Sequence, residues 1–182
     1  MRRYLVPALM MLLLLTGCGE APAERRVEER RDAFAAAELG FTAAVTVTQD
    51  DEVFRCTLEC VSAPEALTVT VTAPENVAGV TAQIRDGETA VEYEGVRLSV
   101  GAAGETGLHP ISAVARLCEA LRRGHVIRAW PEGDETAAEI FIDGETGLTV
   151  WFSGGALTPC GAEFARGGAV AVRCELTNFQ IR

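Results

Sequence analysis

The stretch FTAAVTVTQDDEVFRCTLEC, which occupies residues 41–60, decides the fold of this chain. On either side of Asp50-Asp51 its apolar residues fall at every second position, which is the period of a strand that buries one face. A two-residue turn at these aspartates sets apolar residues opposite each other, in the pairs Val47–Phe54, Val45–Cys56 and Phe41–Cys60. Because both apolar rows then lie on one face, the sequence predicts an antiparallel hairpin.

The same alternation continues beyond this hairpin. A turn at Asp86-Gly87 pairs a second group of apolar residues, Ala82 with Val91 and Val80 with Tyr93. Further strands are predicted at residues 126–130, 137–142, 148–152, 157–165 and 169–181. Pro159 places its strand at a sheet edge, or lies near the strand's start. About ten antiparallel strands in one strongly curved sheet follow from these patterns.

Two segments have helical features. Residues 24–39 are rich in Glu, Arg and Ala, so their first turns are expected in water, and only the part around Phe34 is expected to dock on the domain. Residues 110–123 carry apolar residues at helical spacing, with Pro110 suited to the start and Gly124 to the end. This central helix is the natural cover for the apolar face of the sheet.

The N-terminus has the features of a lipoprotein export signal. Arg2 and Arg3 precede twelve uncharged residues, 4–15, whereas a membrane-spanning helix needs about 20. The following Leu15-Thr16-Gly17-Cys18 resembles the lipobox that is cut before its cysteine, whose sulfur then carries a diacylglycerol. The alternatives are an ordinary secretory signal that contains a cysteine, or an uncleaved anchor helix.

We therefore expect three parts: a signal peptide at residues 1–17, a lipidated tether at 18–24, and one domain at 25–182. The lipid on Cys18 would hold this domain on the extracytoplasmic face of the cell membrane. Loss of Arg2 and Arg3 leaves 14 basic against 26 acidic residues, a net charge of −12. Such an acidic surface repels nucleic acid, which is therefore excluded as a partner.

Five cysteines are left once Cys18 carries lipid, and no C-x-x-C pair suggests zinc or thioredoxin-like chemistry. Cys160 and Cys174 flank Arg166-Gly167-Gly168. A three-residue loop there places the two cysteines opposite each other and permits a disulfide, whereas a two-residue Gly-Gly turn sets Cys160 against Glu175. The alternative to the disulfide is free buried thiols.

Several segments resemble the LolA/LolB-like superfamily, which includes lipoprotein carriers, their lipid-anchored receptors and Gram-positive lipoproteins such as the germination lipoprotein GerS. The segments that carry the likeness are Ala73–Gly79, Ile84–Gly87, Val91–Gly95, His109–Ile111, Ile142–Leu148 and Leu176–Phe179. The likeness covers nearly all of residues 25–182, although each motif is structural and none is chemically specific. The lipobox argues for an anchored protein and against a shuttling carrier.

The resemblance implies a mainly β (α+β) fold: a single curved antiparallel sheet that forms an unclosed half-barrel, with an N-terminal helix and a central lid helix. Such a half-barrel wraps around a hydrophobic cavity. The residues expected to line this cavity are Val45, Val47, Phe54, Leu58, Val69, Val71, Leu117 and Leu121.

No residue pattern indicates catalysis, a metal or a cofactor. His109 and His125 lack metal-ligand spacing, and no serine has a nucleophile-elbow context. The acidic loop residues Asp134, Glu135, Asp143 and Glu145 are more typical of solvated turns than of a calcium site. Trp130 and Trp151 are expected at a lipid-facing mouth. For Trp151, which falls on the face opposite Val150 and Phe152, the alternative is outer-face packing.

Two functions are compatible with these observations, and an enzyme is not expected. In the first, the apolar concave face binds a lipid or the acyl chain of a lipoprotein. In the second, the cavity is filled by the protein's own side chains, and the surface of a structural or regulatory lipoprotein recruits an envelope or spore-germination protein.

Overall fold

The computed structural model describes residues 22–49, 52–102 and 108–182. Its helices are α2 (Ala23–Ala36), α3 (Pro110–Arg123) and the short 3-10 helix η1 (Glu75–Val77). Its strands are β1 (Leu39–Gln49), β2 (Glu52–Ala63), β3 (Ala66–Ala73), β4 (Thr81–Arg85), β5 (Glu88–Tyr93), β6 (Val96–Ala102), β7 (His125–Glu132), β8 (Glu135–Phe141), β9 (Thr146–Ser153), β10 (Thr158–Arg166) and β11 (Ala169–Ile181). The predicted signal peptide and Cys18 lie outside the described residues.

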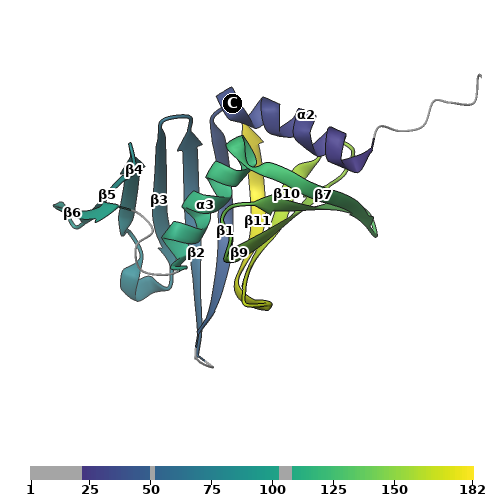
Figure 1. Cartoon of the computed structure of the whole chain (residues 1–182). Helices are drawn as coiled ribbons and strands as arrows, with labels where there is room; N and C mark the ends of the chain where they lie inside the picture. The colour runs from purple at the N-terminus through teal and green to yellow at the C-terminus, as the bar shows by residue number, and fades with distance from the viewer. Residues whose placement is uncertain (1–21, 50–51, 103–107) are drawn as a thin grey trace, which may run out of the picture.

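The strands form one antiparallel sheet in the order β6-β5-β4-β3-β2-β1-β11-β10-β9-β8-β7. The chain runs from the middle of the sheet to the edge at β6, crosses on α3 to the other edge at β7, and returns to the middle as β11. The edges β6 and β7 do not pair, so the sheet stays unclosed, and it curves around α3 (Figure 1). The predicted half-barrel with an N-terminal helix and a central lid helix is confirmed.

The register of the first hairpin is the predicted one, with Val47 opposite Phe54 and Phe41 opposite Cys60. In the second hairpin, Ala82 lies opposite Val91 as predicted. The predicted partner pair of Val80 and Tyr93 is absent from this ladder, because β4 begins only at Thr81.

Three details differ from the sequence prediction. The sheet has eleven strands, because the segment of β6, which was not predicted as a strand, pairs with β5. Leu39 belongs to β1 and not to the first helix, since it pairs with Ser62 and Ile181. The early part of α2 is not surrounded by water: Val27 is buried, and the backbone N–H of Ala129 in β7 donates to Glu24 Oε1 at 3.3 Å.

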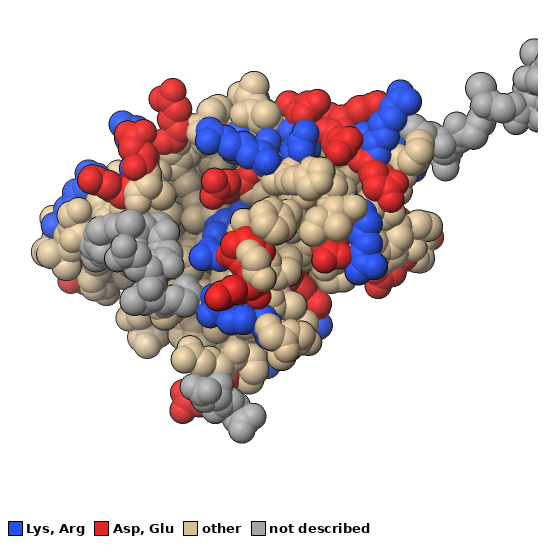
Figure 2. Space-filling view, in the orientation of Figure 1, with Lys and Arg blue, Asp and Glu red and all other residues tan. Residues whose placement is uncertain are grey.

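Pro159 is the second residue of β10, which lies inside the sheet, so the proline is near the strand's start and not at an edge. Charged side chains of both signs gather along α2 at the upper rim of the molecule (Figure 2). None of the described helices is long and apolar enough to cross a membrane.

Candidate functional site

The lid helix α3 lies on the concave face of the sheet with its apolar side inward (Figure 1). Pro110 begins the helix as predicted, and the N–H of Gly124 closes it on the carbonyl of Ala120 at 2.9 Å. Glycine is required at this end, because a Cβ on Gly124 would lie 2.3 Å from Ile140 Cγ2. The lid therefore has a defined start at Pro110 and a defined end at Gly124.

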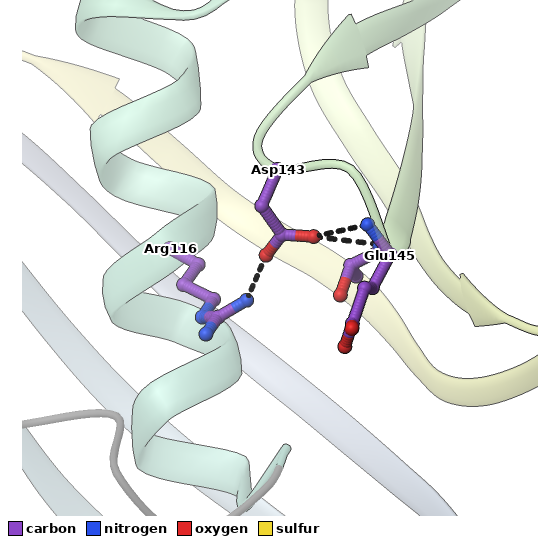
Figure 3. Close-up of polar contacts among 4 residues, drawn as sticks. Arg116, Asp143 and Glu145 are labelled. Atoms are coloured by element: carbon purple, nitrogen blue, oxygen red, sulfur yellow. Dashed lines mark hydrogen bonds and ion pairs between the residues drawn. The ribbon is translucent and has the colours of Figure 1, made fainter.

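An ion pair ties the middle of the lid to the loop between β8 and β9. Arg116 Nη1 lies 2.8 Å from Asp143 Oδ2, while Asp143 Oδ1 accepts the backbone N–H groups of Glu145 and Thr146 at 2.9 and 2.7 Å (Figure 3). Partial burial acts to raise the pKa of Asp143, but these two N–H groups and Arg116 outweigh it, so the pKa is lowered. Asp143 is thus a turn residue that also anchors the lid.

A buried arginine ties the end of the lid to α2 and β2. Arg122 Nη1 donates to the carbonyls of Phe34 and Ala35 at 2.7 and 3.2 Å, and Nη2 donates to the carbonyl of Ser62 at 2.6 Å. No carboxylate faces this guanidinium in the contacts of the described residues, and burial lowers its pKa. The negative end of the α2 dipole, to which Phe34 and Ala35 belong, stabilises the charge instead.

The contact between the two helices is reciprocal. Arg31 of α2 donates from Nη1 to the carbonyl of Gly124, at the end of α3, at 2.7 Å. Each helix thus supplies an arginine to the C-terminal carbonyls of the other. The sequence prediction missed both residues. The available signal was the position of Arg122 on the apolar stripe of α3, eleven residues after Ile111, where a charge needs buried partners.

Six of the eight residues predicted to line a cavity lie in the hydrophobic core beneath the lid, where the lid and sheet side chains pack together. They are Val45, Leu58, Val69, Val71, Leu117 and Leu121. The other two, Val47 and Phe54, lie at the far end of the first hairpin. The described side chains therefore fill the middle of the concave face.

A hollow of about 830 Å³ lies where the β1–β2 hairpin extends past the start of α3. Val47 and Phe54 line it from the hairpin, and His109 and Pro110 line it from the lid. Phe54 is half exposed, although it lies on the same face as the buried Leu58. The concave face thus keeps accessible apolar surface at this end.

A second uncovered part of the concave face lies on β5 and β6, away from the lid in Figure 1. Val91 continues the face of the buried Ala82, with which it pairs, and Leu98 lies opposite Val91 in β6. Leu98 and Val96 are 61% and 60% exposed, which is unusual for apolar side chains on the inner face of a sheet. We call Val91, Tyr93, Val96 and Leu98 the open apolar strip.

Cys160 and Cys174 are not opposite each other and both have free thiols in the structure, so the disulfide between them stays a prediction without structural support. A two-residue Gly-Gly turn closes the β10–β11 hairpin, and a register shift after Phe164 then sets Cys174 opposite Ala162. Cys174 is buried in the core, whereas Cys160 is half-buried and its Sγ contacts Glu135 at 3.5 Å.

Both tryptophans lie on the outer face, so the expectation of a lipid-facing mouth is wrong and that of outer-face packing is confirmed for Trp151. Trp130 in β7 and Trp151 in β9 are both opposite Ala137 in β8. Their indole N–H groups donate to the same atom, Glu132 Oε2, each at 3.2 Å. The two rings therefore converge on one carboxylate.

Within residues 22–49, 52–102 and 108–182, no three His, Cys, Asp or Glu side chains are grouped so that they could hold a metal ion. His109 caps the start of α3, where its carbonyl accepts the Ser112 hydroxyl at 2.8 Å, and His125 begins β7.

No family model matches the sequence, and no curated protein is similar to it. An uncharacterized conserved protein from Thermus thermophilus has a similar structure, with a TM-score of 0.52 and 10% identity over 87% of this chain and 86% of that one. A LolA superfamily protein from Nitrosomonas europaea matches with a TM-score of 0.49 and 13% identity over 89% and 94%. The GerS lipoprotein of Clostridioides difficile, in a structure with the CwlD amidase, matches with a TM-score of 0.47 and 12% identity over 78% and 84%.

The sheet and its lid define a class of fold, the unclosed antiparallel half-barrel. More particularly, the chain shares its fold with the Thermus thermophilus protein. Identities this low concern the fold alone.

Proposed function

We propose that the chain is a lipid-anchored extracytoplasmic lipoprotein that binds an acyl chain, of a lipid or of another lipoprotein, on the uncovered parts of its concave face. The exposed open apolar strip is the observation that carries this proposal. Apolar side chains in water favour an apolar partner, at about 25 cal/mol per Å² of surface removed from water. No catalytic step is part of the proposal.

The hollow beside the lid supports the same function. Its volume of about 830 Å³ falls within the range of small-molecule sites, and Val47, Phe54 and Pro110 supply apolar walls. His109, Gln49 and Glu52 give it a polar margin. An acyl chain has the matching form, since a long apolar chain ends in a polar group.

Binding is tested on the chain from residue 19 onward, exported with a non-lipidating signal. Native mass spectrometry detects co-purified lipid, and a fluorescent fatty acid serves as the probe. Leu98→Glu is expected to weaken probe binding by about tenfold, because a charge would then face the acyl chain. Val61→Glu is the matched control, since Val61 is 44% exposed on the outer face of β2. A chain that carries no lipid and takes up no probe contradicts the proposal.

The anchor is tested separately. Cys18→Ser is expected to release the protein from the membrane or to leave an uncleaved precursor, as seen by fractionation and immunoblotting. Normal processing with full membrane retention contradicts the lipid anchor.

A second candidate function is the recruitment of an envelope protein by a non-catalytic structural or regulatory lipoprotein. The filled interior favours it, because Leu117 and Leu121 of the lid occupy the space where a ligand cavity was expected. Under this proposal the partner binds to the surface of the domain and not to its interior.

A further inference from the structure

The outer face of the sheet carries a hollow of about 260 Å³ over β8 to β11. Trp151 forms one wall, Gly161 lies in the lining beside it, and Glu135, Glu163, Arg173 and Glu175 surround them. Trp151 is on the outer face because its neighbours Val150 and Phe152 are buried in the core. The hollow is therefore on the opposite face from the open apolar strip.

Three of the residues that line this hollow, Trp151, Gly161 and Glu175, belong to a row of residues that crosses five strands. The strand registers place in one row Trp130, Ala137, Trp151, Gly161 and Glu175. Ala137 is completely buried although it is on the outer face, which fits indole rings that flank it on both sides. Gly161 lies on the other side of Trp151 from Ala137, and because it has no side chain the space beside the indole ring stays open.

Neither backbone nor packing requires glycine at position 161. Its φ is not in the left-handed region, and an added Cβ would lie 3.7 Å from the carbonyl oxygen of Cys174 and 3.8 Å from Trp151 Cε3, which are ordinary contacts. The missing side chain is therefore not explained by the fold. What it provides is open space against the face of an indole ring.

The charges around this space favour a cation. Three carboxylates, those of Glu135, Glu163 and Glu175, face one guanidinium, that of Arg173, which is paired with Glu163. The thiol of Cys160 adds no charge, since burial and Glu135 raise its pKa to about 11 and keep it protonated. Within the same row, the guanidinium of Arg128 already lies over the Trp130 ring, 5.0 Å from its centroid.

We propose that this hollow binds an Arg or Lys side chain presented by a basic segment of a partner protein. The indole face of Trp151 accepts the cation and its apolar stem, and the surrounding carboxylates complete the neutralisation. A protein segment fits better than a free amine, because its further basic residues can pair with the remaining carboxylates, those of Glu135 and Glu175. The inference rests on the second candidate function, gives it a location, and is independent of acyl binding.

The test measures binding of a fluorescein-labelled hexa-arginine peptide to the purified chain at about 0.15 M salt, where long-range attraction is screened. Gly161→Ala places a methyl group beside the indole ring of Trp151 without changing any charge, so it is expected to weaken binding about fivefold. Gly155→Ala is the matched control, since its added methyl group meets nothing within 4 Å. In the Trp130→Phe variant, Trp151 is the one remaining tryptophan of the sequence. Its fluorescence then reports on the hollow alone and is expected to change when the peptide binds.

Equal binding by the two glycine variants would overturn the proposal, because the peptide would then bind through diffuse charge attraction. The chain could instead bind phosphatidylcholine vesicles and not the peptide. If Gly161→Ala abolishes that vesicle binding, the hollow binds a lipid headgroup and the proposal is overturned. Should Gly161→Ala unfold, Glu135→Gln replaces it, with the same expected weakening. Fatty-acid binding by Gly161→Ala is expected to equal that of the unchanged chain, so failure of this proposal is distinguishable from failure of acyl binding.

Discussion

The sheet has two wings, one on each side of the central strands β1 and β11. The edges of the open wing, β2 to β6, and of the closed wing, β7 to β10, are protected very differently. At the β7 edge, α2 packs against the strand, which also contains Pro131 and a register shift after Val126. At the β6 edge the described residues provide no such cover, and Leu98 is 61% exposed. Edge strands are normally protected against pairing with other chains.

This difference indicates a division of labour. The lid is tied to the closed wing by Arg116 and Asp143, and its end is tied to α2 by Arg122. These contacts fix the helix over the middle of the sheet and leave the outer strands of the other wing uncovered. The closed wing, the lid and the buried residues of β2 and β3, such as Leu58 and Val69, supply stability, whereas β5 and β6 supply exposed apolar surface.

The largest expected effect comes from comparing a covered leucine with an uncovered one. Leu117→Ala is expected to lower the free energy of unfolding by about 3 kcal/mol, because Leu117 is completely buried and its removal leaves a cavity. Leu98→Ala is expected to change it by less than about 0.5 kcal/mol. Urea unfolding followed by circular dichroism measures both. Similar losses in the two variants would remove the distinction between the wings.

The next effect concerns the buried arginine. Arg122→Ala is expected to lower the free energy of unfolding by about 2 kcal/mol, because the buried carbonyls of Phe34 and Ser62 lose their donor. Arg123→Ala is the control, since Arg123 is the next residue and is exposed. The same urea titration applies, and equal stability of the two variants contradicts the proposed tie between the helices.

The smallest effect is pH-dependent. The folded-state pKa of Asp143 is lowered, so its contribution to stability is present above the unfolded-state pKa of about 3.9 and is lost as the pH falls through the folded value. Asp143→Asn is expected to cost less than about 1 kcal/mol at pH 7, because the pair is partly exposed. The difference from the unchanged chain should shrink below about pH 4.

Thermal unfolding at several pH values measures this difference. Asp134→Asn is its control, because Asp134 lies in the exposed β7–β8 turn. A difference between Asp143→Asn and the unchanged chain that does not vary with pH would contradict the role of the ion pair.

Local patterns predicted the elements whose ends are marked in the sequence. Pro110 and Gly124 defined the lid to the residue, and Asp50-Asp51 fixed the register of the first hairpin. The segment of β6 was missed although Glu94-Gly95 marks a turn and Val96 and Leu98 alternate after it. This alternation is short, so by itself it indicates a strand only weakly.

Tertiary contacts explain the remaining differences. Alternation identified Leu58 and Val69 as inward-facing, but it contains no information on whether a ligand or the lid fills the space opposite them. The two-residue turn at Gly167-Gly168 already prevents Cys160 and Cys174 from lying opposite each other. The register shift after Phe164 moves Cys174 one residue further, to Ala162, and no turn residue signals that shift. The pairing of Arg122 with the carbonyls of α2 depends on how two distant helices meet.

The pairing of β1 with β11 has a consequence for how the chain acquires its structure. β1 is complete only when Val45 has both Cys56 and Cys174 as neighbours, and Cys174 is 129 residues further along the chain. Strands β1 to β6 can pair as successive hairpins while the chain emerges from a ribosome or an export channel, but the middle of the sheet stays unpaired on one side until residues 169–181 arrive. A chain whose residues 169–181 have not yet emerged therefore cannot complete its sheet, however well its first six strands are paired.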